Sequence, residues 1–109
     1  MKDLILKENP NINDYQKYIE EMIEARGFKN TRAEIFMLFL EECGEMAKAA
    51  RHFEQMRVDE GSSKEEHLDH EIADVFIYLL NICNVYGVDL EKAFREKEEI
   101  NKKRSWSSL

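Results

Sequence analysis

The chain has 109 residues, 43% of them hydrophobic, and a formal net charge of −7 at pH 7. This length suits one domain with a modest core, and the acidic balance argues against binding to nucleic acid or a membrane surface through a basic patch. The N-terminal apolar run is too short for a signal peptide, and no stretch approaches the roughly 20 apolar residues of a membrane span. We therefore expect a soluble cytoplasmic protein with neither nucleic acid nor membrane as a partner.

The first helix is predicted to follow the polar loop around Pro10, which is the only proline of the chain. Asn13 or Asp14 can serve as its N-cap by accepting hydrogen bonds from free backbone amides. The helix is then expected over about 15–26, and Gly27 offers the left-handed conformation that commonly ends a helix.

The second helix is predicted to begin at a capping box formed by Thr31 and Glu34, which stand three residues apart. We expect it to run to about Met56. Its apolar positions continue beyond one face, since Phe36 and Met37 lie beside the main stripe. A helix that is apolar over more than one face usually packs against more than one neighbour.

Ser63 and Glu66 form another capping box, which predicts a third helix over about 64–86, and Asp89 is the expected cap of a fourth helix through about Lys103. No alternating strand pattern and no repeat are present. The sequence therefore predicts a single all-α domain over residues 1–109, a four-helix chain with a core of about 13–104. Residues 1–12 and 105–109 are expected to be less ordered. The wide apolar faces predict a homo-oligomer whose helical bundle is completed by partner helices.

Each of the two central helices places an acidic pair in its apolar stripe. Glu42 and Glu45 lie three residues apart on the second helix, and Glu71 and Asp74 repeat this spacing on the third. Residues at this spacing share one helix face, so antiparallel packing of the two helices would bring the pairs together. Four unpaired carboxylates in a partly dry site repel one another, and they require basic partners, protons or bound cations.

Several occupants of such a site are compatible with the sequence. Ion pairs with lysine and arginine side chains nearby are the structural alternative, but two matched pairs on consecutive helices favour a metal site. Ligands that are all oxygen select hard cations, so Mg²⁺ is expected, with Mn²⁺ as the other choice. His67 and His70 could share a ligand face for zinc, but no second pair of Cys or His residues matches them. We interpret them as surface or cap-region histidines.

The segments "EECGEMAKAAR" and "EIADVFIYLLNICNVYGVDLEKAFREKEEINKKR" resemble the MazG-like nucleotide pyrophosphohydrolases of the all-α NTP pyrophosphatase superfamily. The resemblance extends over roughly 27–106. The family pattern is a Glu-x-x-Glu helix, a Glu-x-x-Asp helix and a Lys-x-x-x-Asn-x-x-Arg segment. These motifs fall on Glu42, Glu45, Glu71, Asp74, Lys97, Asn101 and Arg104. Many relatives carry a tyrosine after the last arginine, whereas this chain has Ser105 and Trp106.

The resemblance implies a metal-dependent enzyme that hydrolyses a nucleoside triphosphate between its α and β phosphates, giving the monophosphate and pyrophosphate, with a role in nucleotide-pool cleaning. It implies that the four carboxylates hold Mg²⁺, and we favour Glu45 as the residue that also orients the attacking water. Such enzymes are homodimers or homotetramers.

The side chains expected to bind the substrate fall into two groups. Lys97, Asn101 and Arg104 would bind phosphate oxygens. Aromatic side chains that can stack on the base are Trp106, Phe28 and Tyr78. Base and sugar preference cannot be read from the sequence. Two alternatives stay open: a noncatalytic helical dimerisation or regulatory module that binds cations, and a pyrophosphatase that acts on an atypical pyrophosphate.

Overall fold

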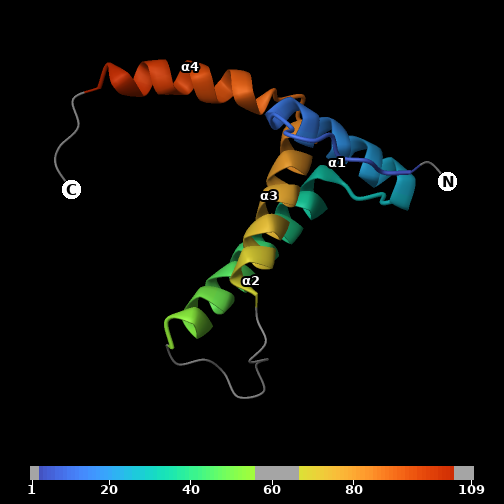
Figure 1. Cartoon of the computed structure of the whole chain (residues 1–109), viewed down its shortest axis with the longest axis vertical. Coiled ribbons are helices and arrows are strands. Elements are labelled where there is room, and N and C mark those ends of the chain that lie inside the picture. The colour runs from blue at the N-terminus through green and yellow to red at the C-terminus, as the bar shows by residue number, and fades with distance from the viewer. Residues whose placement is uncertain (1–2, 56–66, 105–109) are drawn as a thin grey trace.

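The computed structural model describes residues 3–55 and 67–104, and these form four α-helices without a strand. They are α1 (Ile12–Arg26), α2 (Arg32–Phe53), α3 (Leu68–Val85) and α4 (Leu90–Lys102), shown in Figure 1. The prediction of an all-α, four-helix chain is confirmed. Within the described ranges no single helix is long and apolar enough to cross a membrane, while α3 and α4 together pass that test by length and composition as a bent pair.

The start of α1 differs from the prediction. Asn11 is the N-cap, and its side-chain oxygen accepts a hydrogen bond from the Asp14 amide at 2.8 Å. The Asp14 carboxylate accepts from the Asn11 amide in return at 2.9 Å. The prediction of Asn13 or Asp14 as the cap was wrong because Asp14 fills the reciprocal position of a capping box that begins three residues earlier. Gly27 adopts the left-handed conformation at φ 66° and ends the helix, as predicted.

The predicted caps of α2 and α4 are confirmed. Thr31 and Glu34 form the expected capping box, and the Asp89 side chain accepts from the Lys92 amide. Helix α2 ends at Phe53, and α3 begins at Leu68. The predicted α2 end at Met56 and the predicted box of Ser63 and Glu66 lie outside the described residues.

Helix α3 is the centre of the fold, because both α1 and α2 pack against it. Helices α2 and α3 run antiparallel and form the most extensive helix contact (Figure 1). Leu80 of α3 is fully buried, and Ile19 and Met22 of α1 pack with it. Because α3 has neighbours on two sides, its buried face is wider than one stripe.

A hydrogen-bond network centred on Gln16 holds the turn between α3 and α4 against α1. The side-chain Nε2 of Gln16 donates to the Asn84 side-chain oxygen at 3.0 Å and to the Val88 carbonyl at 2.9 Å. The Gln16 side-chain oxygen accepts from the Leu90 amide at 2.9 Å, and the Asn84 side chain donates to the Gln16 carbonyl at 2.8 Å. From this anchor α4 departs at 94° to α3.

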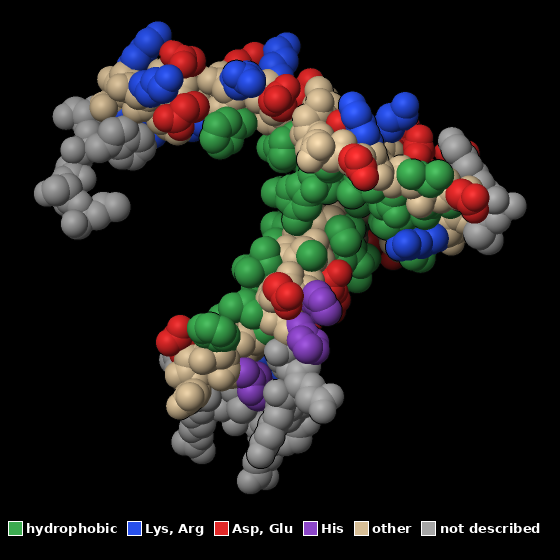
Figure 2. Space-filling model, in the orientation of Figure 1, with side chains coloured by type: hydrophobic (Ala, Val, Ile, Leu, Met, Phe, Trp, Pro, Cys, Tyr) green, Lys and Arg blue, Asp and Glu red, His purple; other side chains and the backbone are tan. Residues whose placement is uncertain are grey.

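The resulting molecule is open. Its extents are 51 × 41 × 31 Å and its radius of gyration is 17.0 Å, against about 13 Å for a compact chain of this length. Helix α4 has no buried residue, and its Phe94 side chain is 66% exposed. On α2, Met37 and Leu40 are 67% and 64% exposed. Figure 2 shows hydrophobic side chains along the α2–α3 pair and on the side of α4 that faces it.

Candidate functional site

The antiparallel packing of α2 and α3 brings three of the four predicted carboxylates together. Glu42 of α2 and Glu71 and Asp74 of α3 each offer an oxygen, and these oxygens all lie within 4.8 Å of one another. Glu71 and Asp74 share one face because they are one helical turn apart. The spacing argument from the sequence therefore predicted this cluster, here called the acidic trio.

The electrostatics of the acidic trio are unfavourable without a cation. Burial raises the pKa of Glu42 above its ordinary value, and the charges of Asp74, Glu71 and Glu45 raise it further. In the described part of the chain, no lysine or arginine forms an ion pair with a member of the trio. Lys92, for example, pairs within α4, where its Nζ lies 4.0 Å from a Glu96 oxygen. The ion-paired alternative therefore lacks partners at the trio.

Glu45, the fourth predicted carboxylate, stands apart from the trio. It lies one helical turn beyond Glu42 on α2 and is exposed. It is near enough for its charge to raise the pKa of Glu42. The fourth carboxylate therefore lies near the trio without being part of it.

The donor set suits a divalent hard cation. Carboxylate oxygens are the ligands that Mg²⁺ and Mn²⁺ prefer, and Mg²⁺ commonly completes its shell with water and substrate phosphate oxygens. Glu42 and Glu71 are half-buried, so a bound cation would offset the repulsion that raises the pKa of Glu42. The residues present therefore fit the predicted metal.

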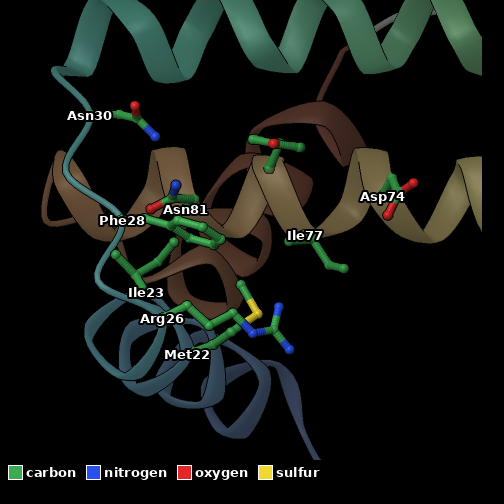
Figure 3. Close-up of a pocket in the computed structure, with 9 residues that line it drawn as sticks. Met22, Ile23, Arg26, Phe28, Asn30, Asp74, Ile77 and Asn81 are labelled. Atoms are coloured by element: carbon green, nitrogen blue, oxygen red, sulfur yellow. The ribbon is translucent and has the colours of Figure 1, made fainter.

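A cavity of about 260 Å³ opens beside the trio, between α1, the loop after it and α3. Asp74 lines one end of the cavity, and Phe28, Asn30 and Asn81 lie toward the other (Figure 3). Phe28 and Tyr78, two of the predicted aromatic residues, both line it. The third, Trp106, lies outside the described residues.

Tyr78 is coupled electrostatically to the trio. Burial raises the pKa of its hydroxyl above the ordinary value of 10.0, and the charges of Glu42 and Asp74 act in the same direction. The hydroxyl is therefore protonated at neutral pH and can donate a hydrogen bond into the cavity.

Three polar residues of the cavity were missed from the sequence. Arg26 ends α1, Asn30 lies in the following loop and Asn81 lies on α3. The one available signal was Asn81, a carboxamide inside the apolar run "YLLNIC". Arg26 and Asn30 stand at a helix end and in a loop, where polar residues are ordinary.

The predicted phosphate-binding residues do not reach the trio of their own chain. Lys97, Asn101 and Arg104 lie on α4 or just after it, and the main helix contact of α4 is with α1. With the 94° bend between α3 and α4, the helical rise places the backbones of Asp74 and Lys97 roughly 20 Å apart. A lysine side chain does not span that gap, so one chain holds the acidic and basic parts separately.

The two histidines at the start of α3 approach each other and Asp69. Their ring centroids are 4.9 Å apart, and ligand atoms of His67, Asp69 and His70 lie within 4.8 Å of one another. All three residues are exposed. This placement agrees with the interpretation as surface and cap-region histidines.

Taken together, the fold and the site define an all-α protein with an acidic cluster, suited to a divalent cation, next to a cavity. The comparison with protein families makes this specific. The family described as the MazG nucleotide pyrophosphohydrolase domain matches residues 30–105, and the chain belongs to this family. The matched range contains α2, α3 and α4 with all the predicted carboxylates.

Individual relatives agree with this assignment. The chain is 34% identical over 98 residues to the uncharacterized protein YvdC of Bacillus subtilis, covering 84% of this chain and 92% of that protein. It is 41% identical over 46 residues to a dATP/dGTP diphosphohydrolase of cyanophage S-2L, covering 42% of this chain and 44% of that one.

A solved structure resembles the fold over most of both chains. It is the cyanophage S-2L MazG-like pyrophosphohydrolase bound to dGDP and three catalytic Mn²⁺ ions per active site. The TM-score is 0.70 at 26% sequence identity, and the match covers 94% of this chain and 89% of the other.

Proposed function

We propose that this protein hydrolyses nucleoside triphosphates between the α and β phosphates, releasing the monophosphate and pyrophosphate. The observation that carries the proposal is the acidic trio of Glu42, Glu71 and Asp74, without basic partners among the described residues, at one end of a cavity that also holds aromatic and amide side chains. The natural role would be the removal of surplus or modified nucleotides from the cytoplasmic pool.

The proposed cofactor is Mg²⁺, with Mn²⁺ as the alternative, held by Glu42, Glu71 and Asp74 and by Glu45 at the rim. Support comes from the oxygen-only donor set and from the Mn²⁺ ions in the cyanophage relative. When bound, such a cation would polarise the phosphoanhydride oxygens and make the attacking water more acidic. The protein's part is to hold the triphosphate and the water in line.

We assign the water-orienting role to Glu45. Its carboxylate is exposed and lies one turn from Glu42, so it can reach a water on the open side of the trio. A carboxylate there would accept the proton as the water attacks the α phosphate. Tyr78, which stays protonated, would donate a hydrogen bond toward the sugar or the α phosphate.

The phosphate-binding groups are proposed to come from a second copy of the chain. Lys97, Asn101 and Arg104 stand on a helix that leaves the α2–α3 pair at 94°, and cationic side chains at the site are needed to offset charge on the departing pyrophosphate. Exposed Phe94, together with the open shape of the chain, supports burial of α4 against another subunit. A homodimer or homotetramer would then carry complete sites.

The base and sugar preference is proposed only as an order of testing. Because a cyanophage S-2L relative is a dATP/dGTP diphosphohydrolase and the solved cyanophage S-2L structure contains dGDP, dATP and dGTP are the first candidates. The experiment incubates the purified protein and Mg²⁺ or Mn²⁺ with a panel of common and modified nucleoside triphosphates. Chromatography that finds monophosphate and pyrophosphate supports the proposal. A folded, metal-saturated protein that consumes none of the panel would favour a cation-binding module or a different pyrophosphate substrate.

A further inference from the structure

Asn81 is the polar member of the buried set in the described part of the chain. Only 7% of its surface is exposed, and it follows the fully buried Leu80 on α3. Cys83, two positions further, is 4% exposed. A carboxamide therefore stands at a position where the helix otherwise buries apolar side chains.

The Asn81 side chain has no hydrogen-bond partner among residues 3–55 and 67–104. Its polar atoms are not sealed from solvent, so water in the cavity can satisfy them until a ligand displaces it. Asn81 lines the cavity beside the trio, and Figure 3 shows it at the end away from Asp74, together with Phe28 and Asn30. The cavity is thus the place from which a partner for this amide can come.

Asn84 shows how the same residue type looks when its role is structural. It lies three positions further along α3, and its carboxamide both donates to and accepts from Gln16. Asn84 lies outside the cavity lining. The contrast indicates that Asn81 is kept for a group that enters the cavity rather than for helix packing.

We propose that the Asn81 carboxamide is a specificity-determining group that reads the hydrogen-bonding edge of the nucleobase. This inference rests on the proposed function, because it takes the cavity as the nucleoside end of the substrate site. Asp74 and Asn81 are seven residues apart on α3, which is roughly 10 Å along the helix axis. A nucleotide whose phosphates lie at the trio therefore extends its sugar and base toward Asn81.

The chemistry of the far end suits a base. An asparagine side chain offers one donor and one acceptor side by side, and such a pair matches two adjacent groups on a base edge. The Phe28 ring, which is 49% exposed and borders the same space, offers a face for stacking. A base that cannot bond to the amide leaves it unpaired and therefore binds less tightly, which is how buried polar groups generate selectivity.

The test measures binding rather than turnover. Dissociation constants of the four common deoxynucleoside monophosphates are determined by calorimetry in Mg²⁺ for the full-length wild type, Asn81→Leu and the matched control Asn84→Leu. The wild type is expected to discriminate among the bases, and Asn81→Leu to lose this discrimination by roughly 5- to 100-fold, the range of one bidentate amide–base pair. Its thermal midpoint should stay level or rise, whereas Asn84→Leu should melt earlier and keep the wild-type base preference.

The inference is overturned by a wild type that binds all four bases equally, or by an Asn81→Leu variant with unchanged affinity ratios. It is also overturned when Asn81→Leu melts as early as Asn84→Leu and loses affinity for all four nucleotides by the same factor. If the leucine variant does not fold, Asn81→Ser removes the amide while leaving space, and the same loss of discrimination is expected. A wild type that binds selectively through Asn81 but hydrolyses nothing supports this inference and overturns the proposed function.

Discussion

Glu42 is the residue on which the chemistry of the site depends most directly. It is the trio member supplied by α2, and burial followed by the charges of Asp74 and Glu71 raises its pKa. Replacing it by glutamine removes the negative charge of one proposed metal ligand and, with it, part of the repulsion within the trio. We expect Glu42→Gln to lower metal-dependent hydrolysis by more than about 100-fold, beyond the effect typical of groups that only orient a ligand. Initial rates of pyrophosphate release measure this.

The matched control for that variant is Glu41→Gln. Glu41 is the preceding residue of α2, is exposed and lies outside the trio. Circular dichroism should show the same helix content in both variants. Hydrolysis by Glu42→Gln near the wild-type rate would contradict the assignment of the trio as the metal site.

The pKa of Glu42 also predicts a pH dependence of stability in the metal-free protein. Because the folded-state pKa lies above the ordinary value of 4.5, the folded chain binds this proton more tightly than the unfolded chain. Well below pH 4.5 the carboxyl is protonated in both the folded and the unfolded chain. At higher pH the unfolded chain releases the proton first, so folding must either take the proton up again or bury a charged carboxylate, and both lower the free energy of unfolding. The free energy of unfolding therefore falls with rising pH relative to Glu42→Gln.

Urea unfolding of chelator-treated wild type and Glu42→Gln at a series of pH values measures this difference. The gap should open as the pH rises above the ordinary value of 4.5 and should close when saturating Mn²⁺ is added to the wild type. A difference that does not vary with pH would show that Glu42 is not strained in the folded state.

At the same scale, the sequence predicted the carboxylates better than the cavity. The trio follows from local helix spacing plus one assumption, antiparallel packing of two neighbouring helices. Asn30 and Arg26 line the cavity only because α1 and the loop after it pack beside α3, and no local sequence pattern predicts that contact. Asn81 could have been singled out as a carboxamide within an apolar run.

At the scale of elements, Gln16 fixes how three helices meet. Its side chain bonds Asn84 of α3, the Val88 carbonyl of the turn and the Leu90 amide of α4. Gln16→Ala removes these bonds and leaves part-buried polar groups without partners. We expect a loss of about 2–4 kcal/mol in the free energy of unfolding, together with faster amide hydrogen exchange in α4.

Urea unfolding and hydrogen exchange of Gln16→Ala measure these effects, with Glu20→Ala as the control. Glu20 lies on the same helix and is exposed, so its substitution should change little. Equal stability of the two variants would show that the network does not hold α4.

The element boundaries show what local sequence can and cannot specify. The capping box that begins at Thr31 and the N-cap at Asp89 were predicted because each is complete within a few residues. The start of α1 was misplaced because two neighbouring caps, Asn11 and Asn13, compete and the pairing with Asp14 decides. The direction of α4 depends on contacts 68 to 74 residues apart in the chain, and no helix pattern contains them.

At the scale of the whole molecule, the proposed site needs two subunits. The trio and the basic residues of α4 lie roughly 20 Å apart in one chain, so complementary variants test whether they meet in an oligomer. We expect Glu42→Gln and Lys97→Ala each to be inactive alone. Co-refolded in equal amounts, they should recover roughly a quarter of the wild-type activity, because half of the dimers are mixed and each carries one intact site.

Light scattering should show the same oligomer for both variants and for the mixture. A mixture that stays inactive despite exchange of subunits would show that Lys97 does not act across the interface. The homo-oligomer predicted from the wide apolar faces stays a prediction, as does the dimer or tetramer that the family resemblance implies. The exposed Met37, Leu40 and Phe94 side chains mark the surface to examine.

The central claim is that the acidic trio serves hydrolysis between the α and β phosphates. The most direct measurement is ³¹P NMR of dGTP or dATP incubated with the wild-type protein and Mg²⁺, repeated with Glu42→Gln. We expect matched growth of monophosphate and pyrophosphate signals in the wild type and neither signal in the variant. Release of inorganic phosphate with a diphosphate product, or equal turnover by Glu42→Gln, would contradict it.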